Sequence, residues 1–379
     1  MVSTGAAAGL EGVVATSSSI CYIDGENGIL SYCGYNINEL ASNASFEEVI
    51  FLLWNGRLPT RAELVALQNQ LVAERDLPAE VTTFLKSVPK NAAPMDVLRT
   101  AVSLLSLYDP LAADSSTEAN VAKAIKLMAR VSTLVTSFDN LRNGSPVVPG
   151  DPSLGYAANF LYTLSGKKPD QVMQRVVDVA LILHADHELN ASTFAARVTA
   201  ATLSDIYSAV TSAIGALKGP LHGGANEGVI QMLLKTKTPD EAVAKVKSDL
   251  ANKVKIPGFG HRVYQVLDPR AIHLKILSEQ LSKSTGHTDL YEKSRRVEQA
   301  VRDLKGLNAN VDFYSASCYY SLGIPVDLFT PIFAVSRMSG WTAHILEQYH
   351  NNRLIRPRAD YTGLPDGQPW VPIEKRTSV

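Results

Sequence analysis

Four short segments each carry a residue suited to forming a carbon–carbon bond next to a carboxylic acid. They contain His187 in HADHELN, His222 in GPLHGGAN, His261 in PGFGHRVYQVLDPR and Asp312 in NANVDFYSAS. An enolate reaction on an anionic substrate needs a base, hydrogen-bond donors for two carbonyl oxygens, and cations for the carboxylates. The aspartate and the histidines could supply the base and the donors, and arginines further along the chain could supply the cations.

The HADH segment also allows a different interpretation. His184 and His187 are three residues apart, so on a helix they would share one face and could bind a metal ion. The spacing matches neither HExxH nor HxxEH, and no third ligand is obvious nearby. A metallohydrolase is therefore an alternative, although a buried structural role is the ordinary fate of such a histidine and is the one we expect for His184.

His222 lies between Leu221 and two glycines, at the junction of two expected helices. Such a histidine could simply cap a turn. Its imidazole could instead project into a cleft, where the glycines leave space for a substrate. The N–H groups at the start of the next helix would favour a neutral imidazole, which can donate a hydrogen bond to a developing enolate.

The segment PGFGHRVYQVLDPR is the most specific of the four. It contains no GxGxxG after a strand and no P-loop, so a dinucleotide-binding fold is rejected. His261 could polarise a ketone while Arg270 binds a carboxylate in bidentate geometry. The alternative for Arg270 is a surface salt bridge. The glycines of the preceding loop, residues 257–260, would let a ligand approach the backbone closely.

Asp312 stands in the apolar sequence VDFYSAS. Burial among apolar side chains would raise the pKa of its carboxyl group and make the carboxylate a better base. The alternative is an ordinary helix N-cap, a position that aspartate often occupies.

Composition limits the remaining classes of function. The chain has 379 residues, 46% of them hydrophobic and 19% charged, which indicates a globular protein long enough for two domains. A net charge of −1 argues against a broad nucleic-acid surface. The three cysteines form no CxxC pair, no secretory leader is recognisable and the apolar runs are too short to span a membrane. We therefore expect a cytoplasmic protein.

Hydrophobic periodicity predicts a mainly α fold with a small N-terminal β-hairpin. The hairpin is expected at 18–32, around an Asp-Gly and Asn-Gly turn. Residues 142–156 are expected to form an irregular connection. Helices are expected at 45–56, 60–74, 94–109, 117–138, 169–187, 205–218, 226 onward, 239–252, 270–285, 288–307 and 331–351.

In this order, the four segments resemble those of citrate synthase. Five further segments strengthen the resemblance and extend it over nearly the whole chain. They are IDGENGILSYCGY, PMDVLRTA at 94–101, RNGSPVVPGDPSLGYAANFLY at 142–162, AVSRMSGW at 334–341 and IRPRADY at 355–361.

The resemblance implies a multi-helical, two-domain homodimer whose active site lies in the cleft between the domains. Residues 1–223 and 324–379 would form the large domain, and residues 224–323 the small domain on the coenzyme A side. The implied reaction condenses acetyl-CoA with oxaloacetate and water at the entry of the tricarboxylic acid cycle. A coenzyme A thioester is then a substrate, and the enzyme needs no metal and no permanently bound cofactor.

The resemblance also assigns roles to individual residues. Asp312 would remove the methyl proton of acetyl-CoA, His222 would stabilise the enolate and His261 would polarise the ketone of oxaloacetate. The groups that bind oxaloacetate would be His187, Arg270, Arg337 and, from the other subunit, Arg356. The groups that meet coenzyme A would be Pro257, Gly258, Phe259, Gly260 and Arg262.

Two positions depart from the family pattern. Gln265 stands where many relatives have a basic residue for the coenzyme A phosphates, with Arg262 as a substitute. Cys33 stands where relatives commonly have arginine, and it could be an oxidation-sensitive thiol. Two alternative functions also remain: a 2-methylcitrate synthase that uses propionyl-CoA, and a non-catalytic helical regulator that binds acyl-CoA. One added methylene changes pocket preference by only about 1–3 kcal/mol, so the thioester is not decided by these residues.

Overall fold

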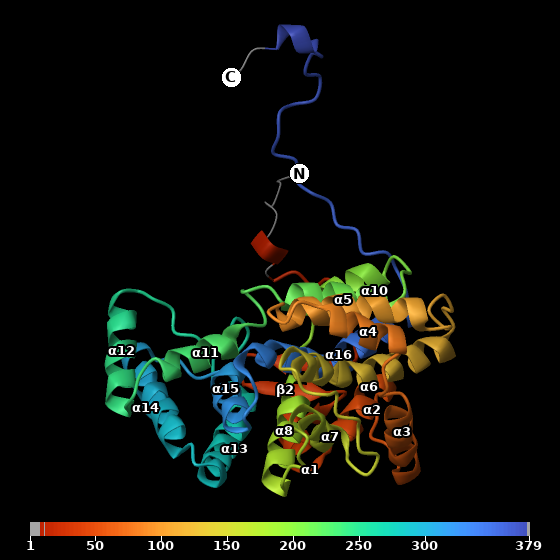
Figure 1. The fold of residues 1–379 in the computed structure, drawn as a ribbon. Coiled ribbons are helices and arrows are strands. Elements are labelled where there is room, and N and C mark those ends of the chain that lie inside the picture. The colour runs from red at the N-terminus through yellow and green to blue at the C-terminus, as the bar shows by residue number, and fades with distance from the viewer. Residues whose placement is uncertain (1–7, 11, 377–379) are drawn as a thin grey trace. The chain divides into compact units, whose positions relative to one another are not determined.

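The computed structural model describes residues 8–10 and 12–376. Residues 18–354 form one compact unit, and the described residues on either side of it (8–10, 12–17 and 355–376) belong to a second one (Figure 1). The second unit contains two short 3-10 helices, η1 (Ala8–Leu10) and η4 (Ile373–Lys375). All other elements belong to the larger unit.

The elements of the larger unit are, in chain order, β1 (Cys21–Asp24), β2 (Ile29–Tyr32), β3 (Tyr35–Asn36), α1 (Ile37–Asn43), α2 (Phe46–Asn55), α3 (Arg61–Ala73), α4 (Ala79–Ser87), α5 (Pro94–Leu105), η2 (Ser106–Tyr108), α6 (Thr117–Arg142), α7 (Tyr156–Ser165), α8 (Gln171–His184), α9 (Ala191–Ala200), α10 (Ile206–Leu217), α11 (Ala225–Leu234), α12 (Pro239–Ala251), α13 (Pro269–Thr285), α14 (Thr288–Lys305), α15 (Val311–Ser321), η3 (Val326–Leu328) and α16 (Phe329–His350). The predicted mainly α fold is confirmed.

The predicted hairpin is present as part of a three-stranded antiparallel sheet in the order β1-β2-β3. Asp24 pairs with Ile29 at the end of the hairpin, and the Asp24 carboxylate accepts the backbone N–H groups of Glu26 and Asn27. This side chain folds the chain back on itself, as Asp does in tight turns. The two-residue strand β3 was not predicted, because it is too short to show any alternation.

Helix α16 is the centre of the larger unit, and α2, α6, α8, α9 and α10 pack around it (Figure 1). Most of its side chains are buried, including Trp341 and Arg337. A Cβ added at Gly340 would lie 2.4 Å from the Ala185 carbonyl oxygen, so the absence of a side chain lets α16 approach the segment after α8. One helix therefore brings the predicted Arg337 close to the predicted His187.

Helices α11 to α15 form a group of their own. Within it α12 packs against α14, and α15 packs against both α11 and α13. The group meets the rest of the larger unit through α1, α8 and α16. Its helices fall inside residues 224–323, the predicted small domain. The domain boundary itself stays a prediction.

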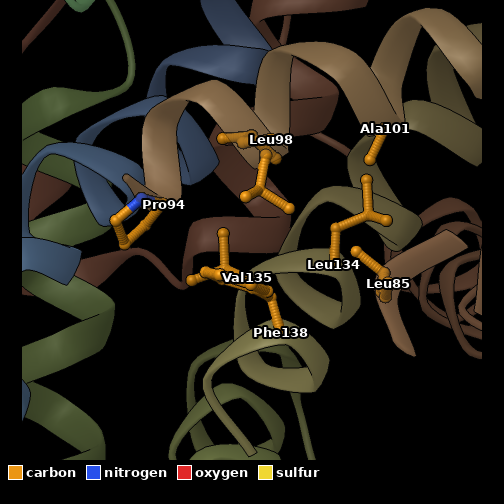
Figure 2. A pocket seen from close by; sticks show the side chains of 8 residues that line it. Leu85, Pro94, Leu98, Ala101, Leu134, Val135 and Phe138 are labelled. Atoms are coloured by element: carbon orange, nitrogen blue, oxygen red, sulfur yellow. The ribbon is translucent and has the colours of Figure 1, made fainter. Parts of the chain in front are cut away.

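An apolar pocket lies between α4, α5 and α6 (Figure 2). It is lined by Leu85, Pro94, Val97, Leu98, Ala101, Leu134, Val135 and Phe138. This lining contains no ionisable side chain, so the pocket belongs to the packed interior and is not a candidate for chemistry. None of the helices in residues 8–10 and 12–376 has both the length and the apolar character that a membrane crossing needs.

Candidate active site

The segment that carries His187 is irregular. Helix α8 ends at His184, and α9 begins after Asn190, whose side chain accepts the Thr193 N–H as an N-cap. The prediction that His184 and His187 share a helical face is therefore wrong. Gly340 of α16 lies against Ala185, the residue that directly follows α8. Among the residues that the structure describes, no group of three or more His, Cys, Asp and Glu side chains could hold a metal ion.

Backbone contacts fix the tautomer of His261. Its Nδ1 accepts the backbone N–H groups of Val263 (2.9 Å) and Tyr264 (3.2 Å). A neutral imidazole whose Nδ1 accepts hydrogen bonds carries its proton on Nε2. His261 therefore offers an Nε2–H donor.

The other catalytic candidate among the histidines, His222, has the opposite arrangement. The Ser192 N–H donates to His222 Nε2 (3.3 Å), and the Ser192 hydroxyl lies 2.8 Å from the same nitrogen. The Ser192 hydroxyl in turn accepts the indole N–H of Trp341 (3.1 Å). With Nε2 as the acceptor, the neutral imidazole of His222 keeps its proton on Nδ1.

All three histidines of the site are held neutral. Burial is the main cause, and it lowers the pKa of His222 and the pKa of His261 to about 4 each. Burial also lowers the pKa of His187 well below its usual value. The charges of Arg337 and Arg270 add to these shifts. The neutral His222 that we predicted therefore owes its state to burial, and the helix N-terminus that we invoked is not the main cause.

Arg270 forms a buried ion pair with Asp268, so the alternative of a surface salt bridge is wrong. The guanidinium donates through Nε (2.9 Å) and Nη2 (2.8 Å) to the two carboxylate oxygens. Burial by itself would raise the pKa of Asp268, but the charge and hydrogen bonds of Arg270 hold it below its usual value. Asp268 also accepts the Val311 N–H (3.2 Å), which ties the start of α15 to this pair.

Arg337 is buried and forms no ion pair among the described residues, although the nearby negative charge of Asp186 partly offsets the lowering of its pKa by burial. Its Nε donates to the His184 carbonyl oxygen (2.7 Å), and its guanidinium carbon lies 4.7 Å from the centre of the Phe333 ring. Its Nη1 group is buried and has no hydrogen-bond partner among the described residues. A buried cation with an unused donor is costly unless an anion binds to it.

Asp312 is the second residue of α15, and the N-cap of this helix is Asn310, whose side chain accepts the Asp312 N–H (3.0 Å). The alternative N-cap role for Asp312 is therefore wrong. Within the described chain its carboxylate makes no hydrogen bond or ion pair. Burial raises its pKa to about 6 against the opposing charges of Arg270 and Arg337.

Ring contacts connect several of these groups. The ring centres of His187 and His261 are 5.3 Å apart. Tyr264 lies against both of them, with ring-centre distances of 5.6 Å and 4.7 Å, and its hydroxyl is 3.2 Å from His187 Nε2. The Phe333 ring lies 6.2 Å from the ring of His222. The structure thus gathers His187 with His261, and His222 with the phenylalanine that faces Arg337.

Tyr264, Phe333 and Ser192 were missed by the sequence analysis. Tyr264 is three residues beyond His261, inside the most specific motif, and this spacing was the available signal. Phe333 precedes Arg337 by four residues on α16, so both lie on one helical face. Ser192 carried no comparable signal, because its contact with His222 joins residues 30 positions apart.

Each of the two glycine pairs near the site has one packed and one open member. A Cβ added at Gly223 would lie 2.5 Å from the Leu217 carbonyl oxygen, and one added at Gly258 would lie 2.7 Å from Val229. Cβ atoms at Gly224 and Gly260 would meet nothing within 4 Å. The space that we predicted for a ligand is therefore open beside Gly224 and Gly260. At Gly223 and Gly258 other residues of the protein occupy it.

For the remaining predicted residues the structure gives positions and exposure, and their roles stay predictions. Arg262 and Gln265 are exposed. Pro257 and Phe259 complete the loop before His261, and Phe259 packs on Phe313 with a ring-centre distance of 4.6 Å. Arg356 is exposed and belongs to the terminal unit.

Cys33 is not a reactive thiol in this fold. Burial, with the negative charge of Asp186 as a second cause, raises the pKa of its thiol to about 11. The thiolate is the form that oxidises, so a raised pKa argues against the oxidation-sensitive role that we considered.

A mainly helical protein with neutral imidazole donors, buried arginines and one weakly acidic carboxyl group is the class of molecule expected for enolate chemistry on an anion. Comparison with known proteins gives a more specific result. The profile of the family described as "Citrate synthase, C-terminal domain" matches residues 9–358. Citrate synthase 2 of Bacillus subtilis is 57% identical over 97% of this chain and 98% of its own length.

Solved structures agree. Citrate synthase of Pyrobaculum aerophilum has a TM-score of 0.91 at 42% identity, covering 97% of this chain and 95% of that one. The enzyme of Thermoplasma acidophilum, in a ternary complex with carboxymethyl coenzyme A and oxaloacetate, has a TM-score of 0.91 at 34% identity, covering 97% and 99%. A 2-methylcitrate synthase of Shewanella oneidensis is also similar, at 42% identity over 97% and 98%. The chain belongs to the citrate synthase family.

The raised pKa of Asp312 predicts a stability gain on substitution. In the wild type, the raised pKa of this group opposes folding increasingly as the pH rises from the ordinary value of 3.8, and the cost is complete above the folded value of about 6. Asp312→Asn removes this cost, so the free energy of unfolding near pH 8 should rise by roughly 1–3 kcal/mol. The gain should shrink as the pH falls from about 6 towards 3.8. Denaturant titrations at several pH values measure it.

Asp303→Asn, on the exposed side of α14, is the matched control and should show no such dependence on pH. A wild type and an Asp312→Asn variant of equal stability at all pH values would contradict the raised pKa of this half-buried, unpaired carboxyl group.

Proposed function

We propose that the protein uses this site to condense acetyl-CoA with oxaloacetate and water, which gives citrate and coenzyme A at the entry of the tricarboxylic acid cycle. Membership of the citrate synthase family supports the reaction. The single observation that carries the assignment of roles is Asp312, a carboxyl group with a pKa of about 6 and no partner in the described chain, within electrostatic reach of Arg270 and Arg337.

Oxaloacetate binds first in this proposal. Arg337 supplies a buried Nη1 donor that no group of the described residues uses, and a carboxylate of oxaloacetate would neutralise it. Nε and Nη2 of Arg270 already donate hydrogen bonds to Asp268, so Nη1 is the group that can donate to the substrate. His187, neutral and buried, adds a donor without adding charge.

The next step forms the enolate. The Asp312 carboxylate takes a proton from the methyl group of acetyl-CoA, and the electron pair moves onto the thioester oxygen. The Nδ1–H of His222 donates to that oxygen. Because the imidazole is already neutral, it can stabilise the developing charge by a hydrogen bond while giving up no full proton.

Carbon–carbon bond formation follows. The enolate carbon attacks the ketone carbon of oxaloacetate, and the ketone oxygen becomes an alkoxide that accepts a proton from the Nε2–H of His261. The proton that Asp312 took from the methyl group is released to solvent and His261 is reprotonated from solvent, so both groups regain their starting states. The product is citryl-CoA. Attack of water on its thioester carbonyl then breaks the carbon–sulfur bond and releases citrate and the thiol of coenzyme A.

The thioester substrate is tested by thiol release, measured with acetyl-CoA and with propionyl-CoA, each with and without oxaloacetate. We expect release that depends on oxaloacetate and is faster with acetyl-CoA. A strong preference for propionyl-CoA would favour the 2-methylcitrate synthase alternative. Acyl-CoA binding without any thiol release would favour the non-catalytic regulator, and loss of thiol release on exhaustive chelation would favour a metal-dependent enzyme.

Asp312→Ala and His222→Ala should each lower kcat by roughly 100- to 10,000-fold, because each removes a group needed only in the transition state. Oxaloacetate binding, measured by calorimetry, should change little. The controls Asp303→Ala and His350→Ala change exposed residues of the same types. Wild-type turnover in either site variant would contradict the assigned roles.

We further infer a homodimer in the cytoplasm. In the larger unit, Leu107 and Leu203 are 74% and 68% exposed, and Thr211 Oγ1 is a buried hydroxyl without a partner among the described residues. In the terminal unit, Trp370 is 84% exposed. A second copy of the chain would cover such surfaces. All three cysteines are free, which fits a reducing compartment.

The proposed contribution of Arg356 to the other subunit's site is tested with hybrids. Asp312→Asn and Arg356→Gln should each be nearly inactive alone. When the two variants are mixed under conditions that exchange subunits, half of the hybrid sites combine a normal Asp312 with a normal Arg356, so activity should return. No recovery would mean that Arg356 acts within its own subunit or not at all.

A further inference from the structure

The turn between β1 and β2 touches the loop that carries His261. The backbone N–H of Gln265 donates to the Gly25 carbonyl oxygen (2.9 Å). Nearby, His273 Nε2 of α13 lies 2.8 Å from the Asn38 side-chain oxygen of α1. The segment 24–38 thus meets the segment 263–273 twice.

Gly25 allows this contact by having no side chain. A Cβ added there would lie 2.1 Å from the Val263 carbonyl oxygen and 2.8 Å from the Val263 carbonyl carbon, both rigid backbone atoms. The backbone of Gly25 is not in the left-handed region, so alanine would suit its conformation. The steric contact with Val263 is therefore the only reason that this position needs glycine.

The same residue, Val263, determines the state of His261. The Val263 N–H donates to His261 Nδ1, and the neighbouring Tyr264 N–H donates to the same atom. The Tyr264 hydroxyl also reaches His187. A shift of Val263 would therefore disturb the orientation and tautomer of His261, and would move Tyr264 away from His187.

We propose that Gly25 is a positioning residue and that the turn Asp24–Gly28 is a backbone support for the His261 loop. The turn holds the peptide of Val263 in place, and this peptide in turn fixes the Nε2–H of His261 towards the substrate. The catalytic consequence rests on the proposed role of His261. The structural consequence, a loop held by the turn, does not.

The test compares Gly25→Ala with Glu26→Ala, a matched variant that removes an exposed side chain from the same turn. Both are assayed for kcat and for the KM of oxaloacetate, and hydrogen exchange is followed at the amides of residues 261–267. Gly25→Ala should lower kcat/KM for oxaloacetate by roughly 10- to 100-fold and speed exchange in the loop, because small displacements of reacting groups are costly. Glu26→Ala should stay within about twofold of the wild type.

Equal exchange and equal kinetics in the two variants would overturn the proposal. If Gly25→Ala fails to fold, Gly28→Ala takes its place, because a Cβ at this other end of the turn would lie 2.8 Å from the Val266 side chain and 3.2 Å from the Leu267 carbonyl oxygen. Faster hydrogen exchange at residues 261–273 in this variant would support the proposal that the turn holds the His261 loop in place. Unchanged exchange would overturn that proposal. A wild type that does not condense the two substrates would overturn the proposed function alone, since the exchange comparison does not depend on turnover.

Discussion

A buried guanidinium that forms no ion pair among the described residues is the constraint on which the site depends. Arg337 is held by the His184 carbonyl oxygen and the face of Phe333, and its Nη1 group has no partner in the described part of the chain. Its charge favours the neutral form of His222 and opposes the burial that raises the pKa of Asp312. An anionic substrate would offset the cost of burying this charge. The charge of Arg337 therefore both binds the substrate and influences the protonation states of His222 and Asp312.

Two imidazoles are prepared for donation in opposite tautomers. Backbone N–H groups occupy Nδ1 of His261, and the Ser192 N–H occupies Nε2 of His222. Each ring is therefore neutral and has its proton on the nitrogen that does not accept a backbone N–H. The main chain, rather than other ionisable side chains, sets this pattern, so the tautomers depend on the positions of the loop after His261 and of the start of α9.

Local signals were sufficient for much of the fold. The Asp-Gly turn predicted the hairpin, and the long final helix was placed to within two residues at its start. Non-local packing was not accessible in this way. Gly340 of α16 packs against the residues that follow α8, and Arg270 is buried in an ion pair with Asp268. The chemically active residues were recognised from their types and order, whereas the residues that orient them were found only from contacts distant in sequence.

The central claim, that Arg337 is a buried cation awaiting an anion, is tested most directly by calorimetric titration of oxaloacetate into the wild type and Arg337→Met. Methionine keeps an apolar side chain against Phe333 and removes the charge. The account predicts that the dissociation constant rises at least roughly 30-fold, since loss of one partner from a buried charge pair costs about 2–5 kcal/mol. It also predicts that the unliganded variant is as stable as the wild type or more so. Unchanged oxaloacetate affinity would contradict the claim.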